Sequence, residues 1–138
     1  MSERTIFITR FDMVRLMDLI EGIRTYNKKS NANLDMLEQE LTRGILVDPK
    51  NVPPDVITMN SKVSITDMDS GEKKIYSLVY PSTAKIDENK LSILAPLGIA
   101  LLGYRTGDII EWRMPSGIKK IKIDEVIYQP EAACEFDL

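Results

Sequence analysis

The stretch VDPKNVPPD constrains the fold more than any other part of this 138-residue chain. Its prolines at 49, 53 and 54 lack a backbone N–H and bias the residues before them toward extended geometry, so no helix runs through it. Before the stretch, apolar residues recur at helical spacing, and after it they alternate as in strands. We therefore predict an N-terminal helical unit in residues 1–47, a linker in residues 48–55 and a C-terminal domain in residues 56–138.

The N-terminal unit is predicted to contain two helices joined by a short polar loop. The apolar segment TIFITRF leads in as a strand, and either Asp12 or Thr9 caps a first helix that runs from about residue 12 to 26. Its apolar stripe consists of Met13, Leu16, Met17, Ile20 and Ile23. Asn33 is the expected cap of the second helix. The stripe of that helix consists of Leu34, Leu37, Leu41 and Ile45. Two such helices pack as a short antiparallel hairpin, a coiled-coil arm roughly 20 Å long.

The segments after the linker have the alternation and the turn residues of an antiparallel sheet. VITMNSKVSITD and KIYSLVYP form two strands, joined through a tight turn at Asp69, Ser70 and Gly71. KLSILA adds a strand, and PLGIALLG forms a short helix with Pro96 at its first position and Gly103 at its end. IIEWRM and IKKIKIDEVIYQ add a second hairpin. The predicted fold class is α+β, with one helix packed on an antiparallel sheet.

The residue types present exclude several kinds of chemistry. Histidine is absent, which removes His-based acid–base and nucleophile systems and nearly every usual zinc site. Cys134 is the single cysteine, so no internal disulfide forms, and a reducing, cytoplasmic location is expected. The net charge of −3 argues against direct nucleic-acid specificity, and the most apolar stretch, SILAPLGIALLGY, is too short to span a membrane. We predict no cofactor and no metal.

Several motifs in the C-terminal part carry a resemblance to a known family. The stretches VITMNSKV, LVYP, APLGIALLG and YQPEAA resemble the C-terminal domain of the bacterial Gre transcript-cleavage factors. They resemble more closely the short-armed relatives of those factors, the regulators of nucleoside diphosphate kinase (Rnk). The resemblance implies an FKBP-like C-terminal fold that binds RNA polymerase at the rim of its secondary channel. Gre factors insert a long coiled coil with paired acids at its tip, whereas Rnk-type proteins are expected to occupy the same site without stimulating cleavage.

The predicted arm tip, RTYNKKSNANLD, lacks the ligands that a magnesium site needs. Magnesium prefers hard oxygen ligands, usually one or two carboxylates, and no acid lies between Tyr26 and Leu34. Lys28 and Lys29 would repel a metal ion. Asp35 is the nearest acid, and in the first turn of the second helix it interacts favourably with the helix dipole. The tip is either a solvated loop or a pair of lysines that contacts an acidic surface or a phosphate.

The resemblance places the polymerase-docking run at Leu94, Ala95, Pro96 and Leu97. Gre factors carry an Asp-Ser-Pro-type run at this place, and this chain has Leu94 and Ala95 where they have the acid and the serine. Alanine is a poor helix cap, so the helix that follows loses a hydrogen bond at its start. The run is either part of the core or an apolar contact patch for a protein partner, and the sequence leaves both readings open.

The predicted function is that of a non-catalytic, monomeric transcription regulator. It binds RNA polymerase near the secondary channel and competes with Gre-type factors. One alternative is weak transcript cleavage through Asp35 or Glu21. Another is peptidyl-prolyl isomerisation on the FKBP-like fold, which needs an aromatic-lined pocket in a chain with only three Phe, five Tyr and one Trp. No catalytic residue is assigned.

Overall fold

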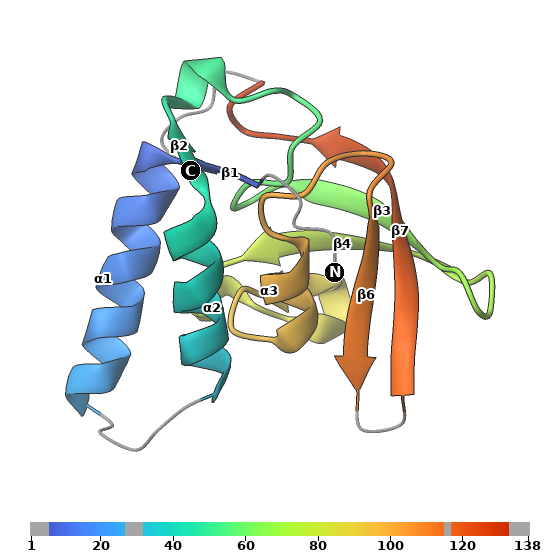
Figure 1. Ribbon diagram of the computed structural model, residues 1–138, viewed down its shortest axis with the longest axis horizontal. Coiled ribbons are helices and arrows are strands. Elements are labelled where there is room, and N and C mark those ends of the chain that lie inside the picture. The colour runs from blue at the N-terminus through green and yellow to red at the C-terminus, as the bar shows by residue number, and fades with distance from the viewer. Residues whose placement is uncertain (1–5, 27–31, 115–116, 133–138) are drawn as a thin grey trace.

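The computed structural model describes residues 6–26, 32–114 and 117–132, and it shows two helices beside a twisted sheet (Figure 1). Helix α1 spans Arg10–Tyr26 and helix α2 spans Ala32–Arg43. Strand β1 (Phe7–Thr9) precedes the helices, strand β2 (Ile45–Val47) follows them, and the two strands pair in parallel. The helical hairpin and the lead-in strand expected from the sequence are therefore both present.

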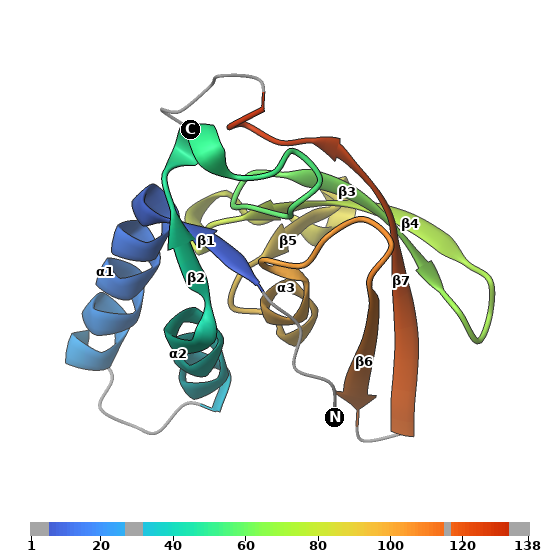
Figure 2. The same ribbon diagram turned by 45° about the horizontal axis from the view of Figure 1, so that its top comes forward.

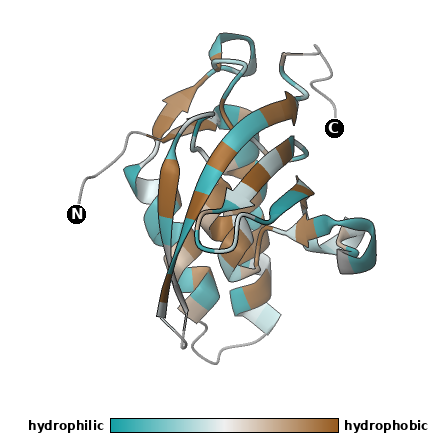
Figure 3. Ribbon diagram, turned by 90° about the vertical axis from the view of Figure 1, so that its right-hand side faces the viewer, coloured by the Kyte–Doolittle hydropathy of each residue, from teal (hydrophilic) through white to brown (hydrophobic). Residues whose placement is uncertain are grey.

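The C-terminal part forms a five-stranded sheet in the order β5-β4-β3-β7-β6. The strands are β3 (Lys62–Asp67), β4 (Lys73–Val79), β5 (Lys90–Ser92), β6 (Ile109–Met114) and β7 (Gly117–Tyr128). Hydrophobic and hydrophilic residues alternate along the strands, as a sheet with one buried face requires (Figure 3). This arrangement confirms the α+β class.

One edge of the sheet differs from the antiparallel prediction, because β5 pairs with β4 in parallel. Between them the chain passes through two short 3₁₀ turns, Pro81–Thr83 and Ile86–Glu88, and returns to lie beside the last part of β4, where Ser77 pairs with Lys90. A crossover of this kind brings the next strand back in the same direction, whereas a tight hairpin would reverse it. Helix α3 (Pro96–Leu101) then packs within the curve of the sheet (Figure 2).

The start of α1 shows which of the two expected caps operates. The backbone N–H of Asp12 donates to Thr9 Oγ1 at 3.0 Å, so Thr9 is the cap and the helix begins at Arg10 rather than near residue 12. Helix α2 begins at Ala32, which places Asn33 inside the first turn instead of at the cap position. Both helices thus start slightly earlier than the sequence indicated, and Asp12 and Asn33 have side chains available for other contacts.

The prediction that Ile45 continues the apolar stripe of the second helix is wrong. The helix ends at Arg43, and Ile45 lies in β2 with 49% of its surface exposed. Gly44 makes the change of direction possible, because a Cβ at this position would lie 2.6 Å from Cγ1 of Ile8. The N–H of Ile45 then donates to the carbonyl of Ile6 at 2.9 Å, so pairing with the N-terminal segment replaces the last helical turn.

A single hydrophobic core runs from the arm into the sheet. From the arm it takes Ile6, Ile8, Leu16, Ile20, Leu34, Leu37 and Leu41, each at most 2% exposed. From the C-terminal part it takes residues of the strands, of α3 and of the segments between them, among them Ile57, Leu78, Ile93 and Ile99. Full burial of one such side chain contributes roughly 2 kcal/mol to the free energy of unfolding. The apolar stripe of α2 is therefore sealed jointly by α1 and α3, and the arm leans on the body of the protein.

The predicted linker is also fastened to the sheet. Gln129 Nε2 donates to the carbonyl oxygens of Pro53 and Val56 at 2.8 and 2.7 Å. Arg105 forms a two-pronged ion pair with Asp55, with its Nη2 atom 3.0 Å from Oδ1. Val52 is buried. These contacts hold the proline-rich segment as a fixed strap between the arm and the C-terminal part.

Candidate interaction site

The run from Leu94 to Leu97 lies at the surface where β5 leads into α3. Ser92 Oγ accepts the N–H of Leu94 at 3.0 Å, which closes the turn before the helix. Ala95 occupies the cap position without any side-chain hydrogen bond, and Pro96 takes the first position of the helix. Pro96 is exposed, while Leu94, Ala95 and Leu97 are half-buried against the core. Each of the two readings of this run thus fits part of it.

The arm touches the same run. Asn33 Nδ2 donates to the carbonyl oxygen of Leu94 at 3.1 Å, so the first turn of α2 lies beside the start of α3. At the other end of α2, Arg43 Nη2 donates to the hydroxyl of Tyr104 at 2.8 Å. These two bonds align α2 along the C-terminal part over its whole length. Local sequence patterns could not indicate the first bond, because Asn33 is equally suited to capping a helix.

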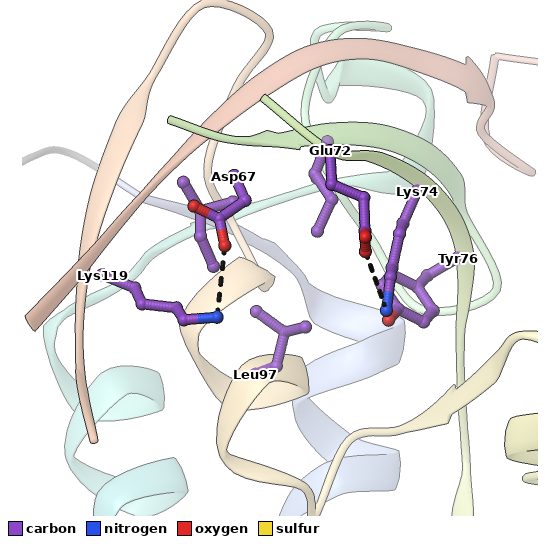
Figure 4. A pocket seen from close by; sticks show the side chains of 8 residues that line it. Asp67, Glu72, Lys74, Tyr76, Leu97 and Lys119 are labelled. Atoms are coloured by element: carbon purple, nitrogen blue, oxygen red, sulfur yellow. Dashed lines mark ion pairs between the residues drawn. The ribbon is translucent and has the colours of Figure 1, made fainter. Parts of the chain in front are cut away.

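A small cleft of about 110 Å³ opens next to this run, between α3 and the sheet (Figure 4). Ile65 and Ile121, which are 5% and 3% exposed, form its floor. Leu97 points into it from α3, and Tyr76 lines it from β4. The cleft is therefore apolar at its base, and it shares Leu97 with the predicted docking run.

The rim of the cleft carries two ion pairs. Lys119 Nζ lies 3.2 Å from Asp67 Oδ2, and Lys74 Nζ lies 3.3 Å from Glu72 Oε1 (Figure 4). The backbone N–H of Asp69, followed by Lys119, lowers the pKa of Asp67. The hydrogen bond to Glu72 raises the pKa of Lys74. Each lysine at the rim is thus paired with one carboxylate.

The arm tip has a different electrostatic arrangement. Lys28 and Lys29 lie outside the described residues. Arg24 Nη2 lies 2.7 Å from Asp35 Oδ1 and its Nη1 lies 3.1 Å from Glu38 Oε1. The hydrogen bond that Arg24 donates to Glu38, followed by the one it donates to Asp35, raises the pKa of Arg24. The two acids nearest the start of α2 are therefore engaged by one arginine that crosses from α1.

Asp12 occupies the joint between the arm and the sheet. It is 4% exposed, and its Oδ2 accepts the N–H of Met59 at 3.1 Å. Burial raises the pKa of Asp12 from 3.8 to about 7, and the nearby carboxylate of Glu131 adds to the rise. The residue that sequence reasoning considered as a helix cap is instead a buried acid that connects α1 to the segment before β3.

Further polar groups surround Asp12 at this joint. The guanidinium carbon of Arg15 lies 4.3 Å from the centre of the Tyr80 ring, a cation–π contact. Thr58 Oγ1 donates to Glu131 Oε1 at 2.6 Å and also contacts Ser61 Oγ. Burial raises the pKa of Tyr80, whose hydroxyl has no hydrogen-bond partner within the described part of the chain. The motifs VITMNS, LVYP and YQPEAA thus converge on one junction.

The described residues contain no group of three or more His, Cys, Asp or Glu side chains arranged to hold a metal ion. Within the same part of the chain, no helix has the length and apolar character needed to cross a bilayer.

Comparison with known proteins identifies the family to which a chain with this fold belongs. The model described as "Transcription elongation factor, GreA/GreB, C-term" matches residues 52–128, and the model "Rnk N-terminus" matches residues 4–47. A solved structure titled "Prokaryotic transcription elongation factor GreA/GreB from Nitrosomonas europaea" is 42% identical, with a TM-score of 0.73. The match covers 91% of this chain and 100% of that one. The fold is therefore a Gre-type C-terminal domain joined to a short arm.

Similar proteins of known name narrow the assignment. The regulator of nucleoside diphosphate kinase from Escherichia coli strain K12 is 39% identical over 140 aligned positions, covering 99% of this chain and 98% of that protein. Transcription elongation factor GreA from Clostridium botulinum strain Eklund 17B is 34% identical over 90 positions, which cover 65% of this chain and 56% of that factor. The chain belongs to the Rnk family, the regulators of nucleoside diphosphate kinase.

Proposed function

We propose that this protein docks on RNA polymerase at the rim of the secondary channel and competes there with Gre-type factors, without stimulating transcript cleavage. The observation that carries the proposal is the ion-pair network of the arm, in which Asp35 and Glu38 both bind Arg24. A carboxylate that is to hold a catalytic magnesium needs free oxygen atoms, and here the acids near the tip are neutralised by a cation. Within its described residues, the arm therefore fills space without offering a metal site.

Support for docking comes from the family and from the surface of α3. The Gre family model matches residues 52–128, and the run from Leu94 to Leu97 within that match is partly exposed. Helix α1 has 17 residues and α2 has 12, so the arm is about 25 Å long at most. Because Asn33 and Arg43 hold α2 against the body, this arm stays near the entrance of a channel. We propose that the protein acts as a cytoplasmic monomer.

A competition assay tests the proposal. Backtracked transcription complexes are incubated with a Gre factor and increasing amounts of this protein, and RNA cleavage is followed on a gel. We expect Gre-stimulated cleavage to fall as this protein is added, and this protein alone to leave the transcript intact. Absence of polymerase binding at micromolar protein, measured by biolayer interferometry, would refute the proposal. The arm variant Asp35→Ala serves as a control that should compete as well as the wild type.

The structure gives less support to the two alternatives. Cleavage through Asp35 or Glu21 would require Asp35 to leave its ion pair with Arg24. Isomerisation would require an aromatic-lined cleft, and among the described side chains that line the cleft beside α3 only Tyr76 is aromatic. A proline-peptide assay that shows acceleration would revive the second alternative, and cleavage that is lost in Asp35→Ala would revive the first.

A further inference from the structure

We propose that the cleft beside α3 is an anchor pocket that receives one large, uncharged apolar side chain from the protein partner. This inference rests on the proposed docking function and specifies the chemistry of the contact. The cleft opens next to the docking run and shares Leu97 with it (Figure 4). The buried Ile65 and Ile121 form its floor. The partner would present a leucine, methionine or phenylalanine at this point.

The size of the cleft selects a side chain over a small-molecule ligand. Its volume is about 110 Å³, whereas pockets for drug-sized ligands and cofactors hold roughly 300–1,000 Å³. An apolar cavity of roughly 150 Å³ holds one benzene molecule, which is close to the size of a single large side chain. A nucleotide does not fit this space, and the end of a leucine, methionine or phenylalanine does.

The electrostatics of the rim select an uncharged side chain. Lys119 is paired with Asp67 and Lys74 with Glu72, so each cation at the mouth already has its anion. A charged group entering between them would leave its hydration shell without finding a free counter-ion, which is unfavourable. An apolar side chain has no charge to desolvate on entry. It would be surrounded by a polar rim, which is the arrangement found at the energetic centre of protein interfaces.

Two substitutions of the same chemical type test the pocket. Leu97→Asp places a charge at the mouth of the cleft, and we expect it to weaken polymerase binding at least tenfold. Ile75→Asp is the matched control, because Ile75 is 42% exposed and precedes Tyr76 on β4, so that its side chain points to the opposite face of the sheet. It should change the affinity less than twofold. Wild-type affinity in Leu97→Asp, with binding by the wild type intact, would overturn the pocket and leave the docking function standing.

A second measurement uses the unmutated protein, so it does not depend on whether Leu97→Asp folds. Isoleucine methyl groups are labelled with ¹³C in a deuterated background, and polymerase is added in substoichiometric steps. We expect the signals of Ile65 and Ile121 to broaden or shift before that of Ile75. Equal behaviour of the three signals in the presence of binding would overturn the pocket. Complete absence of binding by the wild type would instead remove the docking function on which the pocket rests.

Discussion

The joint between the arm and the sheet and the surface around α3 differ in how they use polar groups. At the joint, Asp12 is buried and has a hydrogen bond to the backbone of Met59. Around α3, the charges lie at the rim in exposed pairs such as Lys74 with Glu72, and the floor of the cleft is aliphatic. Buried polar groups fix one geometry at a cost in desolvation, whereas an apolar recess with a neutral rim is suited to contact with another protein.

The difference between these two regions shows which part of the molecule contains the residues of the family motifs. The motifs VITMNS, LVYP and YQPEAA supply Thr58, Tyr80 and Glu131, which lie at the joint. The run at Leu94 and Ala95, where the resemblance implies a departure from the Gre pattern, is half-buried at the start of α3. Most of the motifs therefore supply residues that fix the orientation of the arm relative to the sheet. The departures fall where contact with the partner is proposed.

The largest expected difference between the two regions is the effect of pH on stability, which arises at the joint. The pKa of Asp12 is 3.8 in an unfolded chain and about 7 in the folded protein. Between these values the folded state holds a proton that the unfolded state has released, so the free energy of unfolding falls as pH rises and levels off above about pH 7. The free energy of unfolding falls by about 4 kcal/mol between these two pKa values. Asp12→Asn removes the charge and keeps an oxygen for the Met59 N–H.

We therefore expect Asp12→Asn to raise the free energy of unfolding by up to about 4 kcal/mol at about pH 8 and to change it little at about pH 4. Urea unfolding at a series of pH values, followed by circular dichroism, measures this difference. The groups facing Asp12 are Thr9, Arg15, Tyr80 and Glu131. Glu131→Gln, which removes the neighbouring carboxylate, is the control and should shift the wild-type pH dependence to lower pH. Parallel pH curves for Asp12→Asn and the wild type would contradict the assignment.

The next effect tests whether the arm and the sheet are one cooperative unit. Leu37 on α2 is fully buried in the shared core. Leu37→Ala should lower the free energy of unfolding by about 3 kcal/mol, because it leaves a cavity between α2 and its neighbours. Tryptophan fluorescence of the C-terminal part and helical circular dichroism should still give one coincident transition. Two separate transitions would show that the arm unfolds alone, and the exposed Met36→Ala on the same helix is the matched control.

A smaller effect is expected at the start of α3. Ala95 lacks a capping side chain, and Ala95→Ser would supply a hydroxyl to the first turn of the helix. We expect the free energy of unfolding to rise by about 1 kcal/mol. Thermal unfolding of the variant and the wild type side by side measures the change. If Ala95→Ser has the same stability as the wild type, the hydroxyl does not cap the helix.

The smallest effect belongs to the arm tip. Asp35 and Arg24 form an exposed pair, and exposed ion pairs contribute little because water and salt screen them. Asp35→Ala should leave the midpoint of urea unfolding unchanged within error, at both low and high salt. A clear loss of stability would show that the tip is held as firmly as the joint, and the contrast between the two regions would fail.

Local sequence patterns predicted the elements that depend on neighbouring residues. Gly71 has a φ of 76° in the turn between β3 and β4, and Gly103 has a φ of 84° after α3, as the turn and stop signals indicated. The same patterns could not reveal β2, because its three residues pair with β1 more than thirty positions earlier in the chain. Nor could they reveal the role of Asp12, since only the folded chain brings Met59 to its carboxylate. The docking run remains a prediction.

The bond between Asn33 and the carbonyl of Leu94 holds the tip end of α2 against the body, so any added length would project beyond it. The length of the arm can consequently change without a change in the body of the protein. Seven residues inserted in each helix beyond this bond would extend the arm by about 10 Å. They would rotate its end by only about 20°, because seven residues are close to two helical turns. Short-armed and long-armed proteins can therefore share one base, and the reach of the arm is set by how many heptads are added above it.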